Sequence, residues 1–358
     1  MIDGPDTQDG HTWSGFVRAR IKGPLGLDQE LRVDGMELDR VSVAAFGGQL
    51  FPFEARGRRL DLRWTASAKP FEGISALVGV ERETSKADTG SGFESARNWG
   101  AFAVVRAELG DRASATVSVR RDEPRDFRGV TTARVSGALR LAAGFSAEGD
   151  FGQGFKAPSI FERTYPCLEC IPPRAAVGLR PEHAQGWDAG LSWRSPGGRL
   201  TARARAYGLS VRDQIDYIFP QGYVNLERTR TRGIEAEAHA DLAHGLWLEA
   251  AYAYADSRDE GTGARLLRVP LNSGSATAGW SSGRVELSAS LRAQGPAADV
   301  FGTIRPFAVV DVAGAWRVRP GVQLTARIEN LFNTRYQQAF GYGEPGFGAF
   351  VGVRLRGP

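Results

Sequence analysis

The segment Arg284-Val-Glu-Leu-Ser-Ala-Ser-Leu-Arg292 decides the fold class of this chain, because apolar and polar residues alternate along it without a break. Val285, Leu287, Ala289 and Leu291 fall on one face of an extended strand, and the polar residues fall on the other. Segments of about ten residues with this alternation, separated by turns, recur from about residue 18 to the C-terminal end. The repetition predicts an all-β protein.

The polar face of these segments is unusually charged, where a soluble β-sandwich would present an ordinary solvent face. Small apolar residues fill the opposite face. Such a pattern arises when lipid lies outside a barrel and water lies inside it. It therefore predicts a transmembrane antiparallel up-and-down β-barrel. The charged residues concerned include Arg59, Asp61, Arg63, Arg203, Arg205, Arg327 and Glu329.

The composition agrees with membrane strands and excludes membrane helices. Apolar residues make up 42% of the 358 residues, and no stretch approaches the length of apolar sequence that a membrane helix needs. Membrane strands escape such a search, since every second residue can be polar. The net charge of +4 is small and the basic residues are spread over the strands, so we predict no nucleic-acid partner.

The alternation and the turn residues together predict about seventeen strands. Tight turns rich in Gly, Pro and Asp separate several of them, as at 195–198, 281–283 and 319–321. The predicted strands are 11–22, 30–45, 58–67, 73–83, 98–109, 112–122, 132–142, 144–155, 182–193, 199–215, 223–240, 246–256, 269–281, 284–294, 306–317, 321–330 and 347–356.

Long connections alternate with the tight turns, and this rhythm orients the chain. Outer-membrane barrels have short turns on the periplasmic side and long loops outside, so Leu355 is predicted to end a strand that descends to the periplasmic side. Tryptophans near strand ends fit the interface belts of such barrels. The predicted long connections are 84–97, 156–181, 257–268, 295–305 and 331–346.

Several short segments occur in a distinctive order over roughly residues 144–356. In this order they resemble the C-terminal barrel of the TonB-dependent outer-membrane receptors, and the last is similar to the family's Asn-Leu-Phe signature before the final strand. The segments are Gly152-Gln-Gly-Phe-Lys-Ala-Pro158, Leu179-Arg-Pro-Glu182, Gly186-Trp-Asp-Ala-Gly190, Asn225-Leu-Glu227, Thr231-Arg-Gly-Ile-Glu-Ala-Glu237, Tyr252-Ala-Tyr254, Leu266-Leu-Arg-Val-Pro270, Ile328-Glu-Asn-Leu-Phe-Asn-Thr-Arg-Tyr336 and Gly341-Tyr342.

The resemblance implies a protein larger than this chain. The family has an N-terminal plug, a segment that contacts TonB and about twenty-two strands, so we expect about seventeen strands of such a barrel and no plug domain. Met1-Ile-Asp-Gly4 has neither the basic nor the apolar region of a secretory signal, and we interpret the chain as N-terminally truncated. Residues 1–10 are predicted to be a polar tail or loop remnant, and residues 11–358 the barrel.

The resemblance also implies a function, namely uptake of a scarce nutrient complex across the outer membrane with energy relayed by TonB. Gln214-Ile-Asp-Tyr217 and Leu266-Leu-Arg268 look most like cobalamin receptors, and ferric-siderophore receptors come next. The expected partners are outer-membrane lipid, the TonB complex, a plug domain and a small-molecule or metal-chelate ligand. We expect no enzyme activity and no cofactor.

Two other classes of barrel stay open. A passive porin or structural barrel would share the alternation without the ordered segments. An outer-membrane hydrolase would need a nucleophile, a base and an orienting group close together, whereas His11, His183, His239 and His244 show no partner pattern. Only His183 lies near a predicted extracellular end, and Glu182 beside it points to the opposite face.

By the same resemblance, ligand contacts belong to the extracellular loops and the upper lumen. Exposed aromatic side chains there suit a large planar or apolar ligand. Equally, these aromatic side chains could fold the loops onto each other. The candidates are Phe155, Tyr165, Tyr217, Phe219, Tyr223 and Tyr342.

Cys167 and Cys170 stand together between prolines. A zinc site would need two more ligands, and the prolines argue against a redox motif at a strand-to-helix junction. We predict a surface loop that a small disulfide could close in an oxidising compartment.

Asp3, Asp6 and Asp9 could offer oxygen ligands to calcium, as loops of some cobalamin receptors do. They lack the full spacing of a calcium loop, so we interpret them as part of a polar tail and predict no metal site.

Other residues are interpreted as structural. Gly233 is predicted to let neighbouring side chains close over the strand backbone, and Glu235 and Glu237 to point into the lumen. Asn330 is predicted to satisfy the backbone of its own turn, and Tyr336 and Tyr342 to pack the final long loop.

Overall fold

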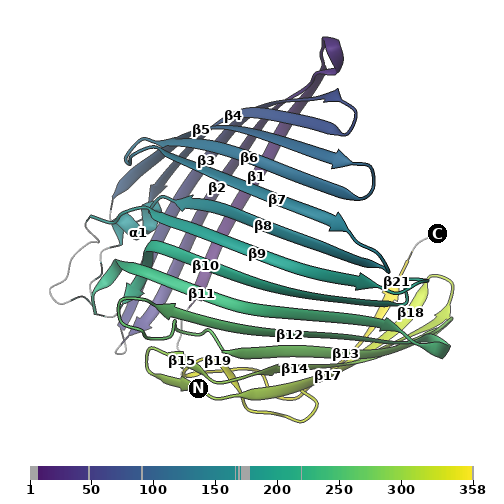
Figure 1. The fold of residues 1–358 in the computed structure, drawn as a ribbon. Coiled ribbons are helices and arrows are strands. Elements are labelled where there is room, and N and C mark those ends of the chain that lie inside the picture. The colour runs from purple at the N-terminus through teal and green to yellow at the C-terminus, as the bar shows by residue number, and fades with distance from the viewer. Residues whose placement is uncertain are drawn as a thin grey trace.

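Seventeen antiparallel strands form one curved sheet in the computed structural model (Figure 1). The structure describes residues 7–46, 49–89, 92–165, 167, 170, 178–218 and 220–356. The all-β prediction and the number of strands are confirmed. The strands of the sheet are β1 (Thr7–Lys22), β2 (Asp28–Phe46), β3 (Gln49–Phe71), β4 (Ile74–Asp88), β5 (Phe93–Leu109), β6 (Ala113–Pro124), β7 (Val130–Arg140), β8 (Phe145–Lys156), β9 (Glu182–Arg194), β10 (Leu200–Ile218), β11 (Gly222–Asp241), β12 (Leu246–Asp259), β13 (Asn272–Ser282), β14 (Val285–Gln294), β17 (Phe307–Arg319), β18 (Val322–Glu329) and β21 (Gly348–Leu355).

The strands pair in chain order, which is the up-and-down topology predicted from the sequence. Each strand from β1 to β14 pairs with the next, and β17, β18 and β21 continue the series. Two small hairpins lie outside the sheet, β15 (Ala297–Asp299) with β16 (Gly302–Ile304), and β19 (Gln337–Ala339) with β20 (Tyr342–Gly343).

The two edge strands run in the same direction, because neighbours are antiparallel and the sheet has seventeen strands. Within the described residues, β1 pairs only with β2, and β21 pairs only with β18. An antiparallel barrel closes with an even number of strands, so β1 and β21 cannot be joined directly as antiparallel neighbours.

The connections differ in length at the two ends of the strands. One end has tight connections, among them 72–73, 283–284 and 320–321, and the turn glycines Gly73 and Gly321 have φ angles of +74° and +77°, a conformation that glycine adopts at little cost. The other end, called here the long-loop end, has the connections 157–181, 260–271, 295–306 and 330–347. Helix α1 (Ile160–Thr164) and the hairpins labelled β15 and β19 lie at this end (Figure 1).

One predicted long connection is wrong, and two predicted strands extend further than predicted. The predicted loop at 84–97 is replaced by β4, which reaches Asp88, and β5, which begins at Phe93. The predicted strands 30–45 and 58–67 extend into β2 and β3, which nearly meet. Beyond the apolar band both faces of a strand can meet water, so pairing continues where the alternation of apolar residues ends.

The first strand likewise begins earlier than predicted. Thr7 pairs with Val43 at the long-loop end, so the last four residues of the predicted tail at 1–10 belong to β1. The remainder of that tail lies outside the described residues.

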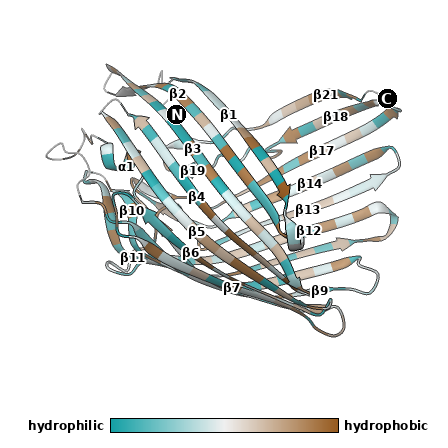
Figure 2. Cartoon of the chain, turned by 90° about the horizontal axis from the view of Figure 1, so that it is seen from above, coloured by the Kyte–Doolittle hydropathy of each residue, from teal (hydrophilic) through white to brown (hydrophobic). Residues whose placement is uncertain are grey.

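Hydrophilic and hydrophobic residues alternate along the strands (Figure 2), so the two faces of the sheet differ in chemistry. On the outward face of β3 and β4, Leu60, Leu62, Val78 and Val80 are each 38–47% exposed. The lumen face of the same strands carries charged residues, and Asp61 there is only 8% exposed. Large apolar side chains left exposed in a continuous band mark a surface that contacts lipid or a partner.

Tryptophans lie at both margins of this outward band, as predicted for interface belts. By strand register, Trp13, Trp99 and Trp187 lie towards the long-loop end. Trp193, Trp280 and Trp316 lie towards the tight-turn end. No helix in the described part of the chain is long and apolar enough to cross a membrane.

Candidate functional site

An ion-pair network lines the lumen face of β3 to β6. Glu81 on β4 accepts hydrogen bonds from Arg63 on β3, at 2.9 Å, and from Arg120 on β6. The second contact crosses β5 at Gly100, where a Cβ atom would lie 2.3 Å from Nη2 of Arg120. Arg120 also donates to Asp122 at 2.6 Å. The missing side chain of Gly100 therefore lets one carboxylate join strands that are not neighbours.

The same arrangement recurs on β8 to β10. Glu148 on β8 accepts hydrogen bonds from Arg203 at 3.2 Å and Arg205 at 2.9 Å, both on β10. These contacts cross β9 at Gly190, where a Cβ atom would lie 3.2 Å from Oε1 of Glu148. Arg205 also lies 3.4 Å from Asp188. The prediction that Arg203 and Arg205 face a polar interior is confirmed.

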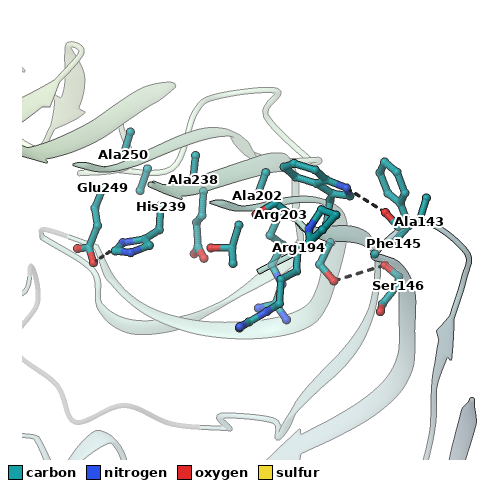
Figure 3. Close-up of a pocket in the computed structure, with 18 of the residues that line it drawn as sticks. Ala143, Phe145, Ser146, Arg194, Ala202, Arg203, Ala238, His239, Glu249 and Ala250 are labelled. Carbon is teal, nitrogen blue, oxygen red and sulfur yellow. Dashed lines mark hydrogen bonds and ion pairs between the residues drawn. The ribbon is translucent and has the colours of Figure 1, made fainter. Parts of the chain in front are cut away.

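Towards the tight-turn end the lumen wall is a concave polar surface (Figure 3). Arg203, His239 and Glu249 point to one side of the sheet, and Ala238 and Ala250 point to the other. Hydroxyl side chains complete this surface, namely Ser146, Ser192, Thr201, Ser275 and Thr277.

His239 has partners that the sequence did not reveal. Its Nδ1 lies 3.1 Å from Glu249 and its Nε2 lies 3.2 Å from Asp241. Glu249 comes from the neighbouring strand in direct register, and residue spacing cannot show such a pairing. The sequence shows no partner pattern for the histidines, and the strand register supplies one for His239. With a carboxylate at each ring nitrogen, the imidazole is not placed to take a proton from a nucleophilic hydroxyl.

Four aromatic side chains gather at the long-loop end, where α1 meets the hairpin of β10 and β11. This aromatic cluster consists of Phe161, Tyr165, Tyr217 and Tyr223, whose neighbouring ring centroids lie 5.4–6.1 Å apart. Most of the pairs meet edge to face, the preferred geometry for aromatic rings. Phe53 on β3 extends the cluster, 6.1 Å from Phe161.

A disulfide lies beneath the same hairpin. Cys167 and Cys170 are bonded to each other and each is 2% exposed. A Cβ atom on Gly222 would lie 3.1 Å from Sγ of Cys167, and the hydroxyl of Tyr217 lies 3.9 Å from the same sulfur. The disulfide therefore contacts the turn between β10 and β11 at Gly222 and the hydroxyl of Tyr217 in the aromatic cluster.

Helix α1 is fixed at its first turn. Ser159 and Glu162 form a capping box, with Ser159 N donating to Glu162 at 2.7 Å and Glu162 N donating to Ser159 at 3.1 Å. Lys156 at the end of β8 donates to Glu162 at 2.9 Å and to Glu182 at 3.1 Å. Burial opposes ionisation of Glu162, but the bonds from Ser159 and Lys156 prevail and lower its pKa below the ordinary value.

Asp299 joins three connections of the long-loop end. Its side chain is 1% exposed and accepts hydrogen bonds from Arg268 at 2.9 Å, Val300 N at 2.6 Å and Phe340 N at 2.9 Å. Mainly because of the hydrogen bond from Arg268, the pKa of Asp299 falls to about 2. Arg268 belongs to the Leu266-Leu-Arg268 segment, so a residue that suggested a substrate class from the sequence has a structural contact here.

The last long connection is built around Asn330. Its Nδ2 donates to Thr334 O at 2.9 Å, and Thr334 N donates to its Oδ1 at 2.7 Å. Asn330 has a φ of 49°, which asparagine tolerates better than most residues. Tyr336 packs on Phe307 with ring centroids 4.6 Å apart. The structural predictions for Asn330 and Tyr336 are confirmed. The packing prediction for Tyr342 is wrong, because its side chain is 71% exposed.

The glycine predicted to accept a neighbouring side chain does so. A Cβ atom on Gly233 would lie 2.4 Å from the ring of Tyr207, and Tyr207 is its register partner on β10. Glu235 and Glu237 are paired with Arg205 and Arg203 in the same ladder, on the lumen face as predicted.

The structure brings three of the six predicted ligand contacts together and separates the others. Tyr165, Tyr217 and Tyr223 all belong to the aromatic cluster, which is the arrangement expected if they fold the loops onto each other. Tyr342 lies in β20 and is 71% exposed. Phe219 lies outside the described residues.

Phe155 lies near the end of β8, on its outward face. The register of β8 and β9 places it on the outward face with Phe151, beside His183, with ring centroids 5.7 Å apart. Glu182 points to the opposite face and contacts Lys156, as predicted.

The calcium option falls mostly on residues outside the described part of the chain. Asp9 is an exposed residue of β1, and Asp3 and Asp6 lie outside the described residues. Over the described residues there is no group of three or more His, Cys, Asp or Glu side chains that could hold a metal ion.

Comparison with known proteins finds a family and a fold. The family described as "TonB dependent receptor-like, beta-barrel" matches residues 5–331. Among solved structures, the copper transporter OprC superposes with a TM-score of 0.84 at 18% sequence identity, covering 97% of this chain and 66% of that chain.

Two receptors for iron chelates are similar in fold. The ferric enterobactin receptor PfeA from Pseudomonas aeruginosa, solved with enterobactin, gives a TM-score of 0.83 at 16% identity, covering 98% of this chain and 63% of that chain. The ferric yersiniabactin uptake receptor FyuA from Yersinia pestis gives 0.78 at 14% identity, covering 97% and 61%. The chain thus spans less than two thirds of the length of each of these proteins.

Proposed function

The chain belongs to the family of TonB-dependent receptor-like β-barrels, and from that premise we propose that it forms most of the wall of an outer-membrane receptor for a metal chelate. The observation that carries the proposal is the contrast between the two faces of the sheet. Exposed apolar side chains cover the outward face, whereas the lumen face is a continuous surface of ion pairs and hydroxyl groups.

The polar lumen supports a plug domain as a partner. A water-filled channel needs only polar residues, whereas a folded domain inside a barrel needs hydrogen-bond donors and acceptors at fixed positions. The ion pairs across Gly100 and Gly190 hold Arg120 and Arg205 in such positions. We infer that the complete protein holds a plug against this wall and receives energy through the TonB complex.

The long-loop end supports ligand entry from the extracellular side. Its connections are tied to each other through Asp299, the disulfide and the aromatic cluster. Ordered loops of this kind reduce the entropy lost when a ligand binds. Among the candidates that the structure describes, Tyr342 in the last connection is exposed, and we propose it as a ligand contact.

We place metal chelates ahead of cobalamin as the ligand class. The two segments similar to cobalamin receptors are engaged in internal contacts, since Tyr217 packs in the aromatic cluster and Arg268 binds Asp299. The similar structures are named as a copper transporter and as receptors for ferric enterobactin and ferric yersiniabactin. Cobalamin stays the second candidate on the strength of Gln214-Ile-Asp-Tyr217.

The test is uptake by cells that carry the full-length gene, with a strain lacking the gene as the control. We expect saturable binding of a ferric siderophore or a copper chelate, abolished when the gene is absent. Cobalamin binding alone would reverse the order of the two ligand classes. Absence of binding for all three, together with steady ion conductance by the purified protein, would favour a passive porin instead.

A further inference from the structure

His239 lies between two carboxylates on the lumen face at the tight-turn end. Its Nδ1 is 3.1 Å from Glu249 on β12 (Figure 3), and its Nε2 is 3.2 Å from Asp241, the last residue of β11. Among the described residues, neither carboxylate has another ion-pair partner. The ring therefore joins Asp241 to Glu249 in one chain of contacts, which we call the histidine bridge.

The histidine bridge requires a proton on both ring nitrogens. An ionised carboxylate only accepts hydrogen bonds, and a neutral imidazole has one N–H donor and one acceptor nitrogen. In the neutral ring, the acceptor nitrogen would face a carboxylate oxygen at 3.1 or 3.2 Å without a proton between them. The complete bridge thus belongs to the charged form of His239.

The three side chains are open enough for the ring to exchange this proton with water. The His239 side chain is 34% exposed, and those of Asp241 and Glu249 are 60% and 59% exposed. Imidazole is the side chain that changes its charge between about pH 5 and about pH 8. When the ring gives one N–H proton to water, one of the two contacts is lost, so the bridge opens whichever nitrogen loses its proton.

Apart from the two carboxylates, no charged group of the neighbouring elements forms an ion pair with the ring in the described part of the chain. Thr201 on β10 and Thr277 on β13, which flank the bridge in register, are uncharged. The two carboxylates are therefore the groups that favour the charged ring. The other charged or titratable residues around the bridge are Arg194, Arg199, Arg203, Glu237 and His244.

The histidine bridge spans the turn between β11 and β12. Asp241 directly precedes this turn, which contains the short 3-10 helix η2 (Ala243–Gly245), and Glu249 follows it on β12. A backbone hydrogen bond also holds the turn, since Leu242 N donates to Leu246 O at 2.7 Å. The bridge thus adds a side-chain connection between the strand before the turn and the strand after it.

We propose that the histidine bridge is a proton-operated fastening of this turn. With the ring charged, both carboxylates are bound and the turn is held closed on the lumen face. With the ring neutral, one carboxylate is released towards the lumen, and the three groups together become more negative by one charge. Protons thus control both the opening of the turn and the charge of the concave surface beside it. The inference depends only on these side chains and holds whichever ligand the receptor carries.

The experiment is amide hydrogen exchange of the full chain in detergent micelles at about pH 5 and about pH 8. Each rate is compared with the intrinsic exchange rate of the same amide at the same pH. We expect the protection of the Leu242 amide to be about threefold higher at the lower pH, the size expected for a partly exposed ion pair. Over the same pH range, the ring-nitrogen signals of isotope-labelled histidine should show His239 losing one ring proton.

Two substitutions of the ring separate its charge from its hydrogen bonds. His239→Lys keeps a charged donor at both pH values, so the protection of Leu242 should stay at the higher level throughout. His239→Gln is uncharged at both pH values, so the protection should stay at the lower level throughout. The matched control is His244→Asn, which removes the histidine of the turn itself. Its φ of 59° is one that asparagine tolerates, and the pH dependence should be unchanged.

The outcomes decide between the bridge and another cause. A protection that does not depend on pH, or that changes where His239 keeps its ring proton, would overturn the proposal. It would also be overturned if the pH dependence persisted in His239→Gln or His239→Lys, or disappeared in His244→Asn. None of these results bears on ligand uptake, so the receptor proposal stands or fails separately.

Discussion

The barrel wall and the loops at its long-loop end carry charge in two different ways. In the wall, carboxylates and arginines pair across strands while the arginines stay open to water, as in Arg63 with Glu81, where the Arg63 side chain is 47% exposed. In the loops, Asp299 is buried and bonded to three separate connections. Exposed pairs contribute little to stability, whereas breaking a buried one is costly. The stability of the wall therefore comes from the alternation of residues along many strands, whereas the stability of the loops comes from a few buried contacts.

Replacing the buried carboxylate should have the largest effect. Asp299→Ala leaves the N–H groups of Val300 and Phe340 without their acceptor, and we expect local destabilisation of about 3 kcal/mol. Hydrogen exchange at these two amides measures it. The control is Asp111→Ala, which breaks an exposed pair with Arg140 at 2.6 Å and should cost less than about 1 kcal/mol. Equal destabilisation by Asp299→Ala and Asp111→Ala would contradict the view that the loops depend on buried contacts more than the wall does.

The same carboxylate predicts a response to acid. Because the pKa of Asp299 is lowered to about 2 when folded, from about 3.9 when unfolded, its contribution is complete above about pH 4. It is lost as the pH falls through about 2. In the unsubstituted chain, we expect the amides of Val300 and Phe340 to lose their protection from hydrogen exchange as the pH falls from about 4 to about 2. In Asp299→Asn this acid step should disappear, and its persistence would assign the step to another group.

Filling a glycine in the wall should have an intermediate effect. Gly233→Val places a side chain against the ring of Tyr207 and the carbonyl of Tyr254, both 2.4 Å from the Cβ position. We expect a loss of about 1–3 kcal/mol in unfolding free energy, measured by urea titration of the folded barrel. Gly35→Val is the matched control, since nothing lies within 4 Å of that position. A similar loss of unfolding free energy in both variants would contradict this, because it would show that the loss comes from a change in backbone conformation and not from a clash with Tyr207.

Removing one wall cation should have the smallest effect. Arg205→Gln breaks its contacts with Glu148 and Asp188, but the site is open to water and Arg203 still binds Glu148 at 3.2 Å. We expect a change of less than about 1 kcal/mol in the same titration. A loss as large as that for Asp299 would mean that the wall also depends on single contacts.

The same division explains what could be predicted from the sequence. The strands of the wall follow from local alternation, so segments such as 284–294 were predicted within one residue of β14. The extended ends of β2 to β5 were missed, because alternation stops where both faces meet water. The roles of Gly233 and Asn330 could also be predicted from nearby sequence. Gly233 contacts its register partner, and Asn330 contacts the backbone of its own turn.

The loop contacts could not be predicted in this way. Asp299 binds Arg268 and Phe340, which are 31 and 41 residues away in the sequence. The aromatic cluster joins Phe161 to Tyr223 through the fold and not through spacing. The partners of His239 required the register of β11 and β12.

The proposed orientation of the two faces can be tested at a pair of adjacent residues. The two cysteines of the chain are joined in a disulfide, so Leu62→Cys and Arg63→Cys each introduce a single free thiol, on the outward and lumen faces of β3. In membranes carrying the protein, each thiol would be tested with a water-soluble maleimide and, after labelling with a fluorophore, with a nitroxide-bearing lipid as quencher.

We expect the probe at position 62 to be quenched by lipid and its thiol to be protected from the water-soluble reagent, with the reverse result at position 63. Equal access of the water-soluble reagent to both positions, without quenching by lipid at either, would contradict a barrel with lipid outside and water inside.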